Sequence, residues 1–299
     1  MTTAIYLLLS AFVLVGAWYA WQAFVLVRKR PSAEPFMPRG SDTALGFVAQ
    51  FFDTLGIGSF ATTTATFKLW RRVSDEQIPG TLNAGYALST IAQALIFVAA
   101  VTVDPITLFS MIAAAIAGAW IGVGIVSRLP RRAIQIGMGV ALLLAAMLFL
   151  ATNLNLMPGG GEAVGLRGGM LAFAIVANFV LGALMMLGIG LYAPCLVLVS
   201  VLGMNPLAAF PIMMGSCALL MPVGGLRFIR SGRLNVRVAL ALTVGAIPGV
   251  LIAGLIVKSL PIVWLRWLIV FVVLYASAQM LLAARRESSA VRTTVWNQP

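Results

Sequence analysis

Leu55-Gly-Ile-Gly-Ser-Phe-Ala61 and Leu187-Gly-Ile-Gly-Leu-Tyr-Ala193 are two copies of one motif, and this repetition decides how the chain is organised. The same offset brings Pro79 onto Pro211, and after a shift of one residue the segments 118–130 and 249–261 also align. A repeat of this extent indicates that one structural unit occurs twice. We therefore expect two related units, at residues 43–152 and 168–284.

The composition around these motifs is typical of a membrane protein. Hydrophobic residues make up 61% of the 299 residues and charged residues only 9%, far fewer than a soluble surface needs. Charge-free stretches such as 77–103 and 105–127 are long enough for a helix of roughly 20 residues to cross the hydrocarbon layer. The run 140–150 is apolar on every face, which favours helices over barrel strands. We expect an all-α integral membrane protein.

The first apolar segment, residues 5–27, could be read as a signal peptide. Its positive charges, Arg28, Lys29 and Arg30, follow the apolar run, whereas those of a signal peptide precede it. This order favours a retained transmembrane helix over residues 1–30, with the N-terminus outside the cell.

The charges between the apolar segments predict that the two units are inverted. The loop at 69–79, which carries two arginines, corresponds to an uncharged loop at 201–211, as expected for equivalent loops on opposite sides of a membrane. Inversion needs an odd number of crossings in each unit. Each unit has four apolar segments, so one of the four should enter and leave by the same side. The glycine-containing segments 43–70 and 168–203 are the candidates for such re-entrant helical hairpins.

This topology has about seven transmembrane helices and two hairpins, and it agrees with the placement of the basic residues. Only Arg167, Lys258 and Arg266, among 20 lysines and arginines, then lie outside. The tail at 285–299 lies in the cytoplasm.

Several classes of function are disfavoured by residue content. Histidine is absent and the eight carboxylates are scattered, so a general acid and base pair is not in evidence and an enzyme is a weak hypothesis. Cys195 and Cys217 lie in apolar segments, where packing is the ordinary role, and neither a metal nor a cofactor is expected. The net charge of +12 is explained by orientation and by contact with anionic lipid headgroups, without nucleic acid as a partner.

An anion in mid-membrane would find no lysine or arginine there. The N-terminal end of a half-helix has unpaired N–H groups and a partial positive charge, so it can bind an anion instead. Each Gly-Ile-Gly turn should open such a half-helix, although close packing through glycine is the alternative. The candidate substrate-binding residues are Gly56, Ile57, Gly58, Ser59, Thr62, Thr63, Asn83, Gly188, Ile189, Gly190, Tyr192 and Ser216.

Asp53 is the most informative carboxylate, because it lies three residues before Gly56 in an otherwise apolar segment. A buried carboxylate is costly, so it is a candidate proton carrier that couples transport to the proton gradient. The alternatives are that it caps the N-terminus of a half-helix or lies near the headgroups. The second unit has Met185 at the equivalent position.

The twin Leu-Gly-Ile-Gly motifs, the Pro79-Gly-Thr-Leu-Asn83 segment, the duplicated unit and the chain length together resemble the sulfite exporter TauE/SafE family of bacterial permeases. The resemblance covers roughly residues 43–284. It implies transport of sulfite, sulfonates or related organosulfur anions across the bacterial inner membrane. Many members have a third glycine after the first motif, where this chain has Ser59.

The leading hypothesis is therefore a secondary transporter for a small anion, with the lipid bilayer and the anion as its partners. A passive anion channel is the alternative, and a membrane scaffold or sensor comes third. The sequence is compatible with a homodimer without requiring one.

Overall fold

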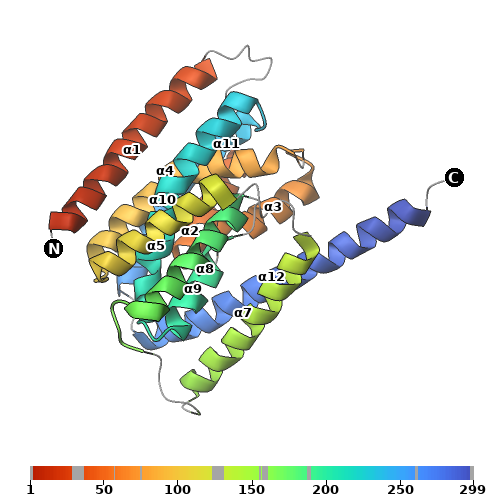
Figure 1. The fold of residues 1–299 in the computed structure, drawn as a ribbon. Helices are drawn as coiled ribbons and strands as arrows, with labels where there is room; N and C mark the ends of the chain where they lie inside the picture. Colours follow the sequence, from red (N-terminus) through yellow and green to blue (C-terminus); the bar gives the residue numbers. More distant parts are fainter. Residues whose placement is uncertain are drawn as a thin grey trace.

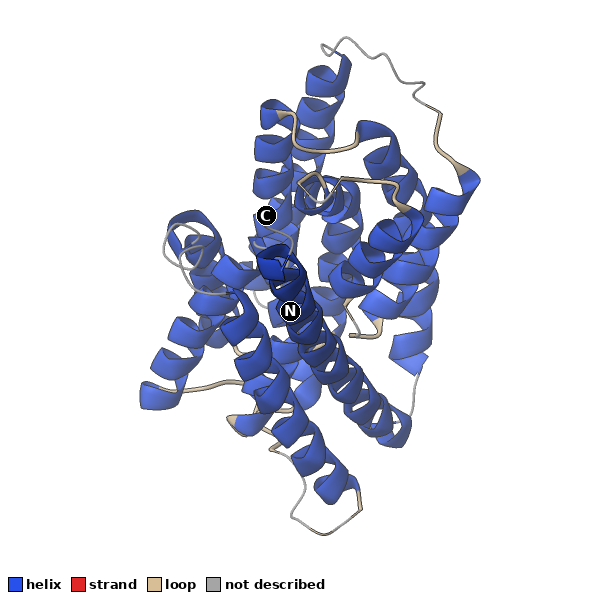
Figure 2. Ribbon diagram, turned by 90° about the vertical axis from the view of Figure 1, so that its right-hand side faces the viewer, coloured by secondary structure: helices blue, strands red, loops and turns tan. Residues whose placement is uncertain are grey.

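The computed structural model describes residues 3–28, 37–56, 58–74, 76–122, 131–154, 156, 161–186, 190–259 and 262–296, and these residues form helices joined by loops (Figures 1 and 2). Five helices of the described chain are long and apolar enough to cross a membrane. They are α1 (Thr3–Arg28), α4 (Ile78–Ala100), α8 (Gly168–Met186), α10 (Ala209–Ser231) and α11 (Val236–Ser259). The chain is thus a multi-pass helical membrane protein, as its composition predicts.

The remaining helices are shorter or less uniformly apolar. They are α2 (Gly40–Thr54), α3 (Ser59–Trp70), α5 (Pro105–Ala117) continued by the π-helical turn η1 (Gly118–Gly122), α7 (Arg131–Asn153), α9 (Tyr192–Val201), the 3-10 turn η2 (Pro206–Ala208) and α12 (Ile262–Trp296). The helix α12 continues through the segment 285–296, which the sequence assigns to the tail.

The helix pairs α2/α3 and α8/α9 contain the two glycine motifs. The helix α2 has 15 residues, about 22 Å, and α3 has 12, so neither alone spans the roughly 30 Å of hydrocarbon. Between them Gly56 and Gly58 have φ of 97° and 83°, values that only glycine adopts without strain. The glycines therefore allow the chain to break sharply between the two half-helices.

The ends of each broken pair lie close together. Beyond the end of α3, Nη1 of Arg72 is 4.0 Å from Oδ1 of Asp42, in the first turn of α2. Beyond the end of α9, the amide of Asn205 donates to the carbonyl of Ala163 at 2.9 Å, shortly before α8 begins. In both pairs the segment that follows the second helix thus contacts the beginning of the pair.

The principal helix pairs of the two halves correspond. The helix α2 lies along α11, α8 lies along α5 and η1, α4 packs on α10, and α7 packs on α12. Exchanging α2 with α8, α4 with α10, α5 with α11 and α7 with α12 reproduces this set of pairs.

Glycines allow both lateral pairs to approach closely. A Cβ atom added to Gly245 of α11 would overlap the carbonyl oxygen of Thr43 in α2. A Cβ atom added to Gly182 of α8 would overlap the carbonyl oxygen of Ala115 in α5. Small residues at helix contacts are typical of membrane proteins, since they bring backbones together.

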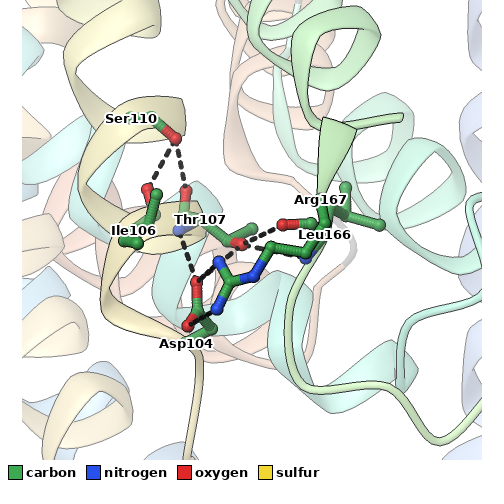
Figure 3. A network of polar contacts seen from close by, with 6 residues as sticks. All are labelled: Asp104, Ile106, Thr107, Ser110, Leu166 and Arg167. Atoms are coloured by element: carbon green, nitrogen blue, oxygen red, sulfur yellow. Dashed lines mark hydrogen bonds and ion pairs between the residues drawn. The ribbon is translucent and has the colours of Figure 1, made fainter. Parts of the chain in front are cut away.

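A polar cluster joins the loop before α5 to the segment before α8 (Figure 3). Arg167 donates two hydrogen bonds to the carboxylate of Asp104, at 2.7 and 2.8 Å, and the amide of Thr107 donates to the same carboxylate at 2.9 Å. These bonds, above all those from Arg167, lower the pKa of Asp104 to about 2 despite some desolvation. Asp104 is therefore both the N-cap of α5 and the partner of Arg167.

Candidate functional site

The two glycine motifs meet in the interior of the bundle. Two small cavities, of about 20 and 40 Å³, are each lined by Gly58 and Phe60 from the first motif and by Gly190 and Tyr192 from the second. The first has room for little more than a water molecule. The two motifs, 132 residues apart in the sequence, thus line the same two cavities.

The N-terminus of α3 is occupied by a carboxylate of the chain itself. The amide of Ser59, the first residue of α3, donates to Oδ1 of Asp53 at 2.5 Å. Gln50 lies one turn earlier in α2, and its amide group donates to the Ser59 hydroxyl at 2.9 Å. Asp53 is 3% exposed, so this cap is shielded from water. The capping role left open by the sequence is therefore present.

Gln93 of α4 is the centre of the polar network. Its side-chain nitrogen donates to Oδ2 of Asp53 at 2.9 Å and to the hydroxyl of Thr54 at 3.0 Å. Its side-chain oxygen accepts a hydrogen bond of 2.8 Å from the hydroxyl of Tyr192, the first residue of α9. A continuous chain of hydrogen bonds thus joins Asp53 of the first motif to Tyr192 of the second.

The two half-helix starts differ chemically. The N-cap of α9, Leu191, makes no side-chain capping bond. Met185, the counterpart of Asp53, lines the smaller cavity with an apolar thioether. The first unit thus places a carboxylate at this cavity, and the equivalent residue of the second unit is apolar.

The structure gathers some of the predicted site residues and separates others. Gly58, Ser59, Gly190, Tyr192 and Asp53 line the smaller cavity. The amide of Gly56 donates to the carbonyl of Asp53 at 2.8 Å, within the turn. Ile57, Gly188 and Ile189 lie outside the described residues.

Three of the other four predicted residues bond within their own helix, and Thr63 bonds to a neighbouring helix. Thr62 donates to the carbonyl of Ser59, Ser216 to that of Ile212 and Asn83 to that of Pro79, each within its own helix. The Thr63 hydroxyl pairs with Tyr86 of α4 at 2.9 Å. None of these four side chains lines the two cavities.

Sequence reasoning did not place Gln93, Gln50 or Thr90 in the site. Gln93 and Gln50 are polar residues in apolar segments, and from the sequence a role at the site and ordinary bonding between helices are equally good interpretations. Thr90, one turn before Gln93 on α4, lines the smaller cavity. The available signal was the polar character of these positions, which identifies neither their partners nor the direction they face.

Chemistry at this site is restricted to hydrogen bonding and charge. Among the described residues no group of three His, Cys, Asp or Glu side chains is placed to hold a metal ion. The groups present can donate to an anion from backbone amides and hydroxyls and can hold a proton at Asp53.

The chain is similar to a known family of membrane proteins. The family described as Sulfite exporter TauE/SafE matches residues 1–149 and 170–298, nearly the whole chain. No curated protein and no solved structure matches. The chain belongs to the TauE/SafE family, whose members are membrane transporters of sulfur anions and not enzymes.

Proposed function

We propose that this protein is a secondary transporter that carries sulfite, a sulfonate or another small organosulfur anion across the bacterial inner membrane, coupled to protons through Asp53. The observation that carries the proposal is the hydrogen-bonded chain from Asp53 through Gln93 to Tyr192, between two half-helix starts that line the same cavities. Family membership supplies the substrate class.

The proposed topology has seven crossings and two re-entrant hairpins, α2/α3 and α8/α9, with the N-terminus outside and the C-terminus in the cytoplasm. The proximity of Arg72 to Asp42, and of Asn205 to Ala163, supports hairpins, because separate crossings would put these ends on opposite sides. The equivalent helix pairs of the two halves support inverted repeats. The helix α8 is long enough to cross alone, so its return through α9 is the element that needs testing.

The anion is held by backbone amides at the two half-helix starts. At α3 the substrate competes with Asp53, since the ionised carboxylate already accepts from Ser59 and repels a second anion. Protonation of Asp53 removes this repulsion and weakens its hold on the α3 start. The anion and the proton therefore enter together, and Tyr192 with Gln93 links the occupancy of one half-helix start to the other.

Transport then follows from a rocking of the two units about this site, which exposes it to one side of the membrane and then the other. The cavities are small in this state, at about 20 and 40 Å³. Because Asp53 has no acidic counterpart in the second unit, a single carboxylate serves both sides in turn.

Uptake by purified protein in proteoliposomes tests the proposal. A labelled panel of sulfite, sulfate, a short sulfonate and a short carboxylate is presented with and without a pH gradient. We expect saturable accumulation of one sulfur anion above its external concentration, only when the gradient is present. Flux that follows the electrochemical gradient and never yields accumulation would indicate a channel. The absence of flux of every anion, with folded protein, would contradict transport of this class.

A further inference from the structure

A larger cavity of about 450 Å³ lies away from the half-helix starts, between α1, α4, α10 and α11. This size is typical of sites for small molecules. Its walls are almost entirely apolar, and the principal contributors are Ala23, Val27, Leu88, Ile229 and Leu240. None of the residues that line the two cavities at the half-helix starts borders it, so it is a separate site.

The polar groups of this cavity are satisfied within the protein, with one exception. The Tyr19 hydroxyl donates to the carbonyl of Ala84 at 2.8 Å, and the Thr243 hydroxyl donates to the carbonyl of Gly85 at 2.7 Å. Arg28 is the exception, because its guanidinium makes no hydrogen bond or ion pair with any described residue. It lies 4.2 Å from the centre of the Phe24 ring.

Arg28 stands at the end of α1, so the cavity has an apolar body and a cationic end. The helix α1 lies at one edge of the bundle (Figure 1), and its residues from Tyr19 to Arg28 contribute to the lining of the cavity. The outer face of α1, with Leu14 and Trp21, is exposed where lipid surrounds the protein.

We propose that this cavity binds an anionic phospholipid, with an acyl chain among the apolar walls and the phosphate group at Arg28. Basic sites between helices near the cytoplasmic surface are suited to anionic headgroups, and each such arginine contributes about 1 kcal/mol, or roughly fivefold in affinity. The lipid would occupy the space between α1 and the helices α4, α10 and α11. This inference depends on the chain's place in the membrane and not on the identity of the transported anion.

Native mass spectrometry of the full chain in a neutral detergent tests it, with phosphatidylglycerol and phosphatidylcholine of identical acyl chains added in equal amounts. We expect one phosphatidylglycerol to be retained in preference to phosphatidylcholine. Arg28→Gln should reduce this preference roughly fivefold, and Arg132→Gln, which removes an exposed arginine from α7, should not. Ala23→Trp should reduce the binding of both lipids, and Leu14→Trp on the exposed face of α1 should not.

Arg28 is exposed, so its replacement leaves the fold intact and gives a decisive result. Equal retention of the two lipids by the wild type would overturn the proposal. An Arg132→Gln effect as large as that of Arg28→Gln, or full retention by folded Ala23→Trp, would also overturn it.

Discussion

Tyr192 and Gln93 connect the two halves of the site through a single hydrogen bond of 2.8 Å. The bond joins the start of α9 to a side chain that also holds Asp53 and Thr54. Both side chains are buried, so loss of this bond leaves a polar atom in the protein interior.

Tyr192→Phe removes this bond and leaves the Gln93 oxygen without its donor. We expect a loss of about 1–3 kcal/mol in the free energy of unfolding, because a buried acceptor is left unsatisfied. Uptake of the anion should fall roughly tenfold, equivalent to about 1.4 kcal/mol in the transport barrier. Denaturant unfolding and initial uptake rates measure the two effects.

Tyr19→Phe is the matched control, since it deletes a buried hydroxyl that donates to Ala84 far from the half-helix starts. It should reduce stability similarly and leave uptake unchanged. Equal loss of uptake in the two variants would mean that the effect of Tyr192→Phe is one of folding alone.

For single residues, the sequence predicts which of them lie at the site better than it predicts their hydrogen-bond partners. Gly58 and Gly190 were predicted by the repeated motif, and Asp53 by being a lone carboxylate in an apolar segment. Gln93 has its role because α4 brings it to Asp53, 40 positions earlier, and to Tyr192, 99 positions later. A local sequence pattern does not predict contacts over such separations.

The helices α2 and α11 pack with their backbones in close contact, and a single added methyl group disturbs this contact. Gly245→Ala places a Cβ atom against the carbonyl of Thr43, so α11 and α2 must separate. We expect a loss of about 1–3 kcal/mol in stability, measured by denaturant unfolding. Gly137→Ala on α7 is the control, because its Cβ meets nothing within 4 Å and alanine favours helix by up to about 1 kcal/mol. A loss at Gly137→Ala as large as at Gly245→Ala would rule out close contact as the cause.

The Asp104 and Arg167 pair predicts a pH dependence of stability. The folded pKa of Asp104 is about 2, below its unfolded value of about 3.9, so its stabilisation is present above about pH 4 and is lost as the pH falls toward 2. Asp104→Asn keeps an N-cap for α5 but removes the charge. The stability difference between wild type and this variant, measured by denaturant unfolding over this range, should shrink as pH falls. A constant difference would show that the ion pair is not its origin.

The hairpin α2/α3 predicts that its two ends are reached from the same side of the membrane. Gly40→Cys and Ser74→Cys, at exposed positions flanking the pair, should react with an impermeant thiol reagent from one side only. Glu162→Cys, just before α8, should react from the other side. Reaction of positions 40 and 74 from opposite sides would mean that α2 and α3 together cross the membrane.

The glycine motifs predict where these elements break, because a sharp turn requires φ values that other residues avoid. Helix lengths were less predictable. The helix α12 runs to Trp296 through residues assigned to the tail, since charged residues at 285–287 do not oppose helix once it extends beyond hydrocarbon.

For the whole molecule, the repeated sequence predicts two related units, and the helix pairing is equivalent between them. The units differ at one position that matters for the proposed coupling: the first unit has Asp53 where the second has Met185. An acidic group in only one unit suits a transporter in which a single proton site alternates between two sides. What the repeat alone cannot predict is that the two motifs enclose common cavities, because this depends on how the units dock.

The most direct test of proton coupling through Asp53 is sulfite uptake by Asp53→Asn in proteoliposomes, with and without a pH gradient. Asparagine retains an oxygen that accepts from the Ser59 amide, so the α3 start stays capped. Its side chain cannot take up and release a proton as a carboxylate does. We expect exchange of labelled for unlabelled sulfite to persist while gradient-driven accumulation is lost, and Asp104→Asn to retain both. Accumulation by Asp53→Asn to the wild-type level under the same gradient would contradict the coupling role of this carboxylate.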